Sequence, residues 1–71
     1  MTRIEIIEAL KDLFEVENLS EDIILSDFEG WDSIMMMSLV SFADINFKKQ
    51  MKMQDMKNFK TIKDIINFLN I

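Results

Sequence analysis

Apolar residues recur at the spacing of an α-helix in three separate stretches of this chain, and no proline interrupts any of them. The stretches are residues 3–15, residues 33–47 and a last segment that starts at Thr61. An apolar residue at every third or fourth position is typical of a helix with one buried face. The chain also contains only one glycine, which disfavours a turn-rich β fold. We therefore predict an all-α protein in which residues 1–71 form a single domain.

Two of the expected helices begin with a capping-box pattern. Thr2 is followed three residues later by Glu5, and Thr61 is followed by Asp64. In such a box the hydroxyl and the carboxylate satisfy each other's backbone N–H groups at the start of the helix. We expect Thr2 to be the N-cap of the first helix and Thr61 to start the last helix.

The connections between these helices differ in length. Residues 16–32 form a long connection rich in turn-forming residues, in which a short helical turn is conceivable near residues 21–24. Residues 48–54 form a polar connector, and residues 55–59 are expected to make one short helical turn. The predicted fold is a four-helix bundle of three main helices and one short helix, with a long loop between the first and second helices. Residues expected to anchor the connections to the core are Leu19, Ile23, Ile24, Leu25, Phe28, Met51 and Met53.

The composition limits how such a fold can be stabilised and where it can be located. The chain has no cysteine and no histidine, so a disulfide is impossible and a zinc site is not expected. A chain of 71 residues buries only about 60% of its unfolded surface, so its stability rests on a small apolar core. No apolar run approaches the roughly 18 residues that span a membrane, and no secretory leader is apparent. We expect no membrane insertion and a cytoplasmic location.

Charge is distributed unevenly along the chain. Residues 1–33 contain ten acids and two bases, whereas residues 34–71 contain three acids and six lysines. The acidic half repels phosphate backbones, so nucleic acid is not an expected ligand. The lysines are interpreted as a solvated face.

The expected second helix is apolar on nearly every side. Residues 34–43 carry no charge. At 100° per residue, one face suits the core and collects Met36, Leu39, Val40, Ala43 and Phe47. A helix that is apolar all round is either buried or offered to a partner, and flexible methionines suit several partners. We predict a partner-binding face made of Ile34, Met37, Ser38, Ser41, Asp44 and Ile45.

A serine stands where the acidic connection becomes this helix. Ser33 could simply be the N-cap, because serine is preferred there. The same position also favours a phosphate group, since the start of a helix carries free amide protons and partial positive charge. Asp32 could favour the helix dipole, Trp31 is expected to anchor the loop by packing, and Gly30 is expected to permit a turn. Without a histidine or another evident base, Ser33 is not expected to act as a hydrolytic nucleophile.

These residues resemble those of a known family. The run Gly30-Trp31-Asp32-Ser33-Ile34 resembles the attachment signature of the acyl carrier protein family, in the form found in specialised and aminoacyl carriers. Leu39-Val40 and Phe47 stand where that family places core residues of its second helix. Residues 59–66 resemble the start of its last helix. The similarity covers nearly the whole chain.

The resemblance implies a function and a set of partners. Ser33 would be esterified with 4′-phosphopantetheine, taken from coenzyme A by a phosphopantetheinyl transferase. Asp32 would assist this attachment, with a magnesium ion held mainly by the transferase. The protein would not be an enzyme and would be a monomer. It would hold an acyl or aminoacyl group as a thioester and present it, through the second helix, to a loading enzyme and to acceptor enzymes.

Two departures from the family narrow this expectation. Carriers of fatty acid synthesis usually display an acidic second helix, but only Asp44 is acidic on the predicted partner-binding face. Phe42-Ala43 reverses the usual small-then-large order, so core packing is expected to differ. A dedicated pathway of secondary metabolism or surface-polymer assembly is therefore favoured over bulk fatty acid synthesis. One alternative is a helical adaptor that binds its partner through Ile34, Met37 and Ile45 and carries no prosthetic group, and a Ser33-dependent hydrolase is the least expected.

Overall fold

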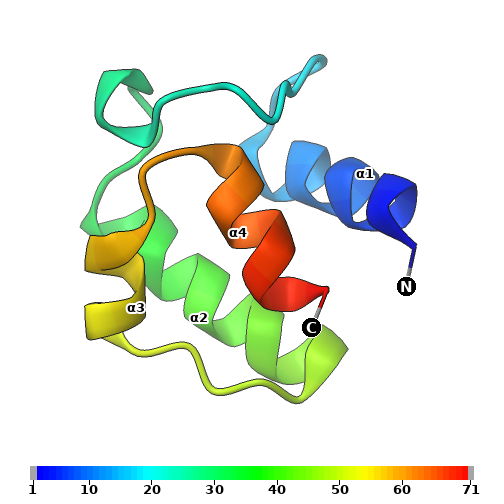
Figure 1. The fold of residues 1–71 in the computed structure, drawn as a ribbon, viewed down its shortest axis with the longest axis vertical. Helices are drawn as coiled ribbons and strands as arrows, with labels where there is room; N and C mark the ends of the chain where they lie inside the picture. The colour runs from blue at the N-terminus through cyan, green and yellow to red at the C-terminus, as the bar shows by residue number, and fades with distance from the viewer. Residues whose placement is uncertain (1, 71) are drawn as a thin grey trace.

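The computed structural model describes residues 2–70, and within them the chain forms four α-helices and no β-strand. The helices are α1 (Arg3–Phe14), α2 (Ser33–Phe47), the short α3 (Met53–Asn58) and α4 (Ile62–Leu69). Helix α1 packs against both α4 and α2, and Figure 1 shows α1 and α3 on opposite sides of the pair formed by α2 and α4. The all-α prediction is confirmed.

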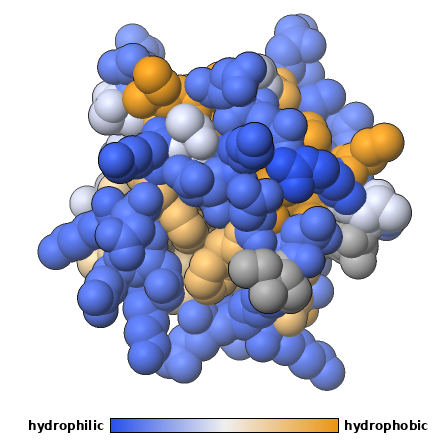
Figure 2. Space-filling model, viewed as in Figure 1, coloured by the Kyte–Doolittle hydropathy of each residue, from blue (hydrophilic) through white to orange (hydrophobic). Residues whose placement is uncertain are grey.

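One apolar cluster lies between the helices. Every helix contributes buried side chains to it, and no polar or charged side chain among residues 2–70 is buried. Figure 2 shows that hydrophilic side chains cover most of one face of the molecule, where hydrophobic ones form separate small groups. The buried side chains are Ile6, Leu10, Phe14, Leu25, Leu39, Ala43, Met51, Met56, Ile62, Ile65, Ile66 and Leu69.

Both predicted capping boxes occur where the sequence places them. The Glu5 backbone N–H donates to Thr2 Oγ1 at 3.2 Å, and the Thr2 backbone N–H donates to the Glu5 carboxylate at 3.0 Å. At the start of α4 the Thr61 backbone N–H donates to the Asp64 carboxylate at 3.1 Å. Thr2 and Thr61 are the N-caps of α1 and α4, so each helix proper begins one residue later.

The carboxylate of Asp64 accepts two backbone hydrogen bonds at the start of α4. Backbone N–H groups of Lys60 and Thr61 donate to the Asp64 carboxylate and lower its pKa below the ordinary value. The ionised form is therefore favoured in the folded state. Its stabilising effect is present above the unfolded pKa of about 3.9 and is lost as the pH falls through the lower folded pKa.

We expect Asp64→Asn to weaken the pH dependence of stability, because asparagine keeps an acceptor oxygen but cannot ionise. The loss of stability between about pH 6 and about pH 3, measured as a shift of the urea unfolding midpoint, should be smaller in the variant. The pKa of Glu5 is lowered by the backbone and side chain of Thr2, so part of the dependence should remain. An identical shift in both proteins would contradict this assignment.

The segment between α1 and α2 is held against the start of α4. It contains a hydrogen-bonded turn at residues 21–22 and, just beyond the helical turn expected near residues 21–24, a 3₁₀ helix, η1 (Leu25–Asp27). The Leu25 backbone N–H donates to the Lys60 carbonyl at 2.9 Å, and the Ile62 N–H donates to the Ile23 carbonyl at 3.1 Å. An isolated antiparallel bridge between Ile24 and Thr61 accompanies these bonds. Ile24 itself is exposed and does not anchor the segment to the core as expected, whereas Leu25 does.

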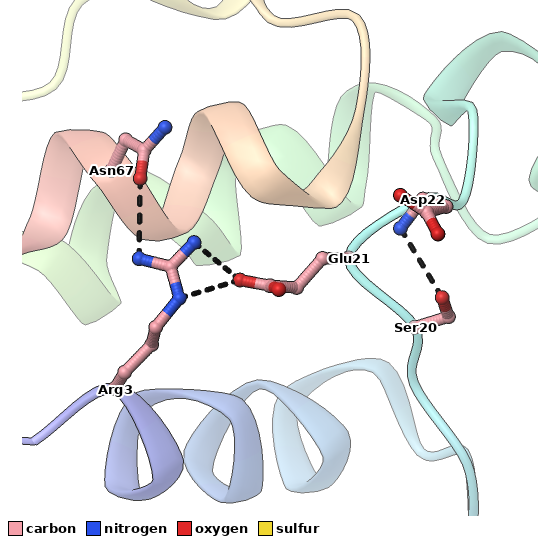
Figure 3. Close-up of polar contacts among 5 residues, drawn as sticks. All are labelled: Arg3, Ser20, Glu21, Asp22 and Asn67. Carbon is pink, nitrogen blue, oxygen red and sulfur yellow. Dashed lines mark hydrogen bonds and ion pairs between the residues drawn. The ribbon is translucent and has the colours of Figure 1, made fainter.

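A polar contact also ties this segment to α1 and α4 (Figure 3). Arg3 Nε donates to the Glu21 carboxylate at 2.6 Å, and Arg3 Nη1 donates to Asn67 Oδ1 at 3.2 Å. Because Arg3 and Glu21 are partly exposed, this pair contributes little net stability. The contact joins Glu21 of this segment to α1 and, through Arg3, to Asn67 of α4.

The connection after α2 differs from the prediction in its register. Helix α3 begins at Met53, two residues before the expected turn, and the Lys52 backbone N–H donates to the Asp55 carboxylate at 2.9 Å. Met51 is buried as predicted, but the prediction that Met53 faces inward is wrong. With the helix starting at Met53, Met56 is the residue of α3 that reaches the core.

Candidate functional site

Asp32, and not Ser33, is the N-cap of α2. Its backbone is extended (φ −128°, ψ −177°), and its Oδ1 accepts the Met35 backbone N–H at 2.9 Å. Its carbonyl accepts the Met36 N–H at 2.9 Å. Ser33 is the first residue of the helix and is exposed, and no hydrogen bond to its hydroxyl is formed within residues 2–70. The N-cap interpretation of Ser33 is therefore wrong, because the neighbouring carboxylate takes that role.

An aromatic cluster holds the turn that precedes Ser33. The Phe14 ring meets the Phe28 ring edge-on, with centroids 5.5 Å apart, and the Trp31 ring at 6.4 Å. The backbone N–H of Trp31 donates to the Phe28 carbonyl at 3.0 Å, and the backbone N–H of Asp32 donates to the Gly30 carbonyl at 3.1 Å. Trp31 is half-buried against the core, as expected for a packing anchor.

Gly30 serves this turn by its small size. Its φ is not positive, so the backbone does not need the conformational freedom of glycine. A Cβ at this position would lie 3.0 Å from Cε2 of the Phe28 ring and 3.2 Å from its Cζ. Few Cβ contacts are this short, so a side chain here would force the Phe28 ring to move. The glycine therefore allows the aromatic cluster to close over the chain just before Asp32.

The chemistry available around Ser33 is limited. The charged residues that precede Ser33 in the chain, Asp27, Glu29 and Asp32, are exposed carboxylates, and the chain has no histidine that could deprotonate the hydroxyl. Among residues 2–70 no three acidic side chains lie close enough together to hold a metal ion. The start of α2 therefore offers one exposed hydroxyl that follows a series of exposed carboxylates in the chain.

Helix α2 presents two different faces. Leu39 and Ala43 are buried, and Met36, Val40 and Phe47 pack partly buried against the core. We call the opposite side the outer face of α2. Of its members only Ser38 is half-buried, and the large apolar side chains are strongly exposed: Ile34 is 76% exposed, Met37 67% and Ile45 75%. The outer face comprises Ile34, Met37, Ser38, Ser41, Asp44 and Ile45.

Two hollows adjoin the start of α2. A shallow one of about 370 Å³ lies on the outer face and is lined by Ile34, Met37, Ser38 and Ser41. The other, also of about 370 Å³, lies between η1, the start of α2 and α3. Sequence reasoning missed the second hollow, because its walls come from segments whose contacts are long-range. They include Ile24, Trp31, Met36, Met56 and Phe59, together with the exposed Lys57 and Lys60.

Comparison with known proteins assigns no family. No family model matches the chain, and no curated protein or solved structure is significantly similar to it. Among residues 2–70 no helix combines the length and the apolar character needed to cross a membrane.

Proposed function

We propose that this chain is a carrier protein that holds an acyl or aminoacyl group on 4′-phosphopantetheine attached to Ser33. The observation that carries the proposal is the exposed Ser33 hydroxyl on the first residue of α2. It leaves room for a transferase to approach. The choice of 4′-phosphopantetheine as the attached group rests on the resemblance of residues 30–34 to the attachment signature of the acyl carrier family. The three longer helices, the short α3 and the connection that precedes Ser33 suit the same role.

The start of α2 suits a phosphodiester. Asp32 takes the amide of Met35, but no backbone acceptor within residues 2–70 takes the amides of Ser33 and Ile34. These donors, with the positive end of the helix dipole, stabilise a negative group on Ser33. The Asp32 carboxylate, on the residue before Ser33, is held in place by the Met35 amide. We assign Asp32 to assisting the attachment, with magnesium bound mainly by the transferase.

The protein would carry its cargo without acting as an enzyme. When attached, 4′-phosphopantetheine supplies a terminal thiol that forms a thioester with the acyl or aminoacyl group. The chain contributes the tether point and the outer face of α2, which a loading enzyme and acceptor enzymes would contact. We propose that it works as a monomer in the cytoplasm.

The outer face favours a dedicated pathway. Asp44 is the only charged residue on it, whereas three large apolar side chains are exposed. A partner that binds an acidic helix through charged side chains would form few ion pairs with this face, so we propose partners with an apolar binding surface. Such partners suit amino acid or short acyl transfer in secondary metabolism or surface-polymer assembly better than bulk fatty acid synthesis.

The same exposed face supports a second candidate function. An adaptor that binds its partner through Ile34, Met37 and Ile45 would need no prosthetic group. The experiment that separates the two is the intact mass after incubation with coenzyme A and a broad-specificity phosphopantetheinyl transferase. A gain of one phosphopantetheine unit, absent when either reagent is omitted, supports the carrier. An unchanged mass would favour the adaptor.

Met37→Glu is expected to slow the modification of Ser33 by about tenfold, because a carboxylate would replace an apolar contact one helical turn from the serine. Since Met37 is exposed, the far-UV circular dichroism of the variant should match that of the wild type. The measurement is kcat/KM for the transferase. Met53→Glu, at an exposed methionine of α3, is the matched control and should leave kcat/KM unchanged. Equal rates for both variants would refute the role of the outer face, and unfolding of Met37→Glu would refute its exposure.

A further inference from the structure

The methionines of this chain lie in very different environments. Met51 and Met56 are buried, and Met35 and Met36 are half-buried. Within residues 2–70 only Met37, at 67%, and Met53, at 51%, are largely exposed. Because peroxides oxidise the thioethers that they can reach, these two sulfurs should react before the others.

Met37 occupies the more consequential position of the two. It lies four residues after Ser33, so the two side chains share one side of α2. Together with Ile34 it lines the shallow hollow of the outer face. Residues 33–43 contain no charged side chain, so this part of the outer face depends on apolar contact to bind a partner.

Oxidation would reverse the character of this contact. Methionine sulfoxide is polar and chiral, whereas the thioether is flexible and apolar. A sulfoxide oxygen enclosed by an apolar partner without a hydrogen bond would oppose binding. The fold should survive, because Met37 is not part of the buried core.

We propose that Met37 is a site of reversible oxidation whose sulfoxide switches off docking on the outer face of α2 and thereby slows modification of Ser33. The inference rests on the proposed carrier function. In the forward step hydrogen peroxide transfers one oxygen atom to the Met37 sulfur, which is oxidised, and the peroxide is reduced to water. In the reverse step a sulfoxide reductase removes that oxygen as water while two of its thiols are oxidised to a disulfide.

The test uses the full chain before and after limited treatment with hydrogen peroxide. Peptide mass spectrometry should find sulfoxide at Met37 and Met53 before Met35 and Met36, with unchanged far-UV circular dichroism. The kcat/KM for phosphopantetheinylation of Ser33 should fall by about tenfold and should recover after treatment with methionine sulfoxide reductases of both stereospecificities.

Two variants separate the effect of Met37 from general oxidation. Each is compared with its own untreated sample. Peroxide should not change the rate of Met37→Leu, whereas the rate of Met53→Leu should fall as it does in the wild type. Equal rates for treated and untreated wild type, an equal fall in Met37→Leu, or earlier oxidation of Met35 or Met36 would each overturn this inference while leaving the carrier function intact. An untreated protein that is never modified would overturn both.

Discussion

Replacing Ser33 by alanine is expected to abolish the gain of one phosphopantetheine unit completely. The phosphodiester forms on the serine oxygen, and alanine offers no atom to accept it. The start of α2 should survive, because Asp32 supplies the N-cap and alanine is the best helix former. The expected result is an unchanged intact mass from a protein whose far-UV circular dichroism matches that of the wild type.

Ser41→Ala is the matched control for this prediction. Ser41 is an exposed serine of the same helix, about two turns from Ser33, and it has no acid immediately before it. Its replacement removes a hydroxyl from the outer face but no attachment point, so the full mass gain should be reached once the reaction is complete, whatever the change in rate. A gain of one unit in Ser33→Ala would show that the attachment point has been placed wrongly.

Replacing Phe14 by alanine is expected to reduce the free energy of unfolding by about 3–5 kcal/mol. Phe14 is buried, and its ring meets Phe28 at 5.5 Å and Trp31 at 6.4 Å between centroids. The variant loses apolar burial and leaves a cavity under the turn that leads to Ser33. A chain of this length is stable by only about 4–11 kcal/mol, so the variant should be close to unfolding at room temperature.

Urea denaturation measures this loss, and Ile45→Ala provides the comparison. Ile45 lies on the outer face of α2 and is 75% exposed, so its truncation should change the unfolding free energy by less than about 0.5 kcal/mol. A Phe14→Ala variant within about 1 kcal/mol of the wild type would mean that the aromatic cluster does not support the turn.

Features fixed by local spacing were predictable from the sequence. The apolar residues of α1 and α4 recur at helical intervals, and the pairs Thr2–Glu5 and Thr61–Asp64 mark where these helices begin. The bounds of α2, from Ser33 to Phe47, follow from the same pattern. The division of α2 into a packed face and an exposed face was predictable because each face repeats with the helical period.

Features that depend on competition between neighbours or on distant contacts were not predictable. Asp32 and Ser33 are both good N-cap residues, and only the backbone conformation decides that Asp32 accepts the Met35 amide. The register of α3, which buries Met56 and exposes Met53, likewise depends on where the helix begins.

Contacts between distant segments carry no local signal. The bridge between Ile24 and Thr61 joins residues that are far apart in the sequence. The hollow beside Trp31 and Lys60 is likewise lined by residues from distant segments. The small size required at Gly30 depends on where the Phe28 ring lies, which spacing alone does not give.

The measurement that tests the central claim most directly is tandem mass spectrometry of peptides from the protein after treatment with transferase and coenzyme A. The account predicts one phosphopantetheine unit on the peptide that contains Ser33, with fragment ions that place it on that residue. A unit found instead on Ser26, Ser38 or Ser41, or no unit on any peptide from a folded protein, would contradict it.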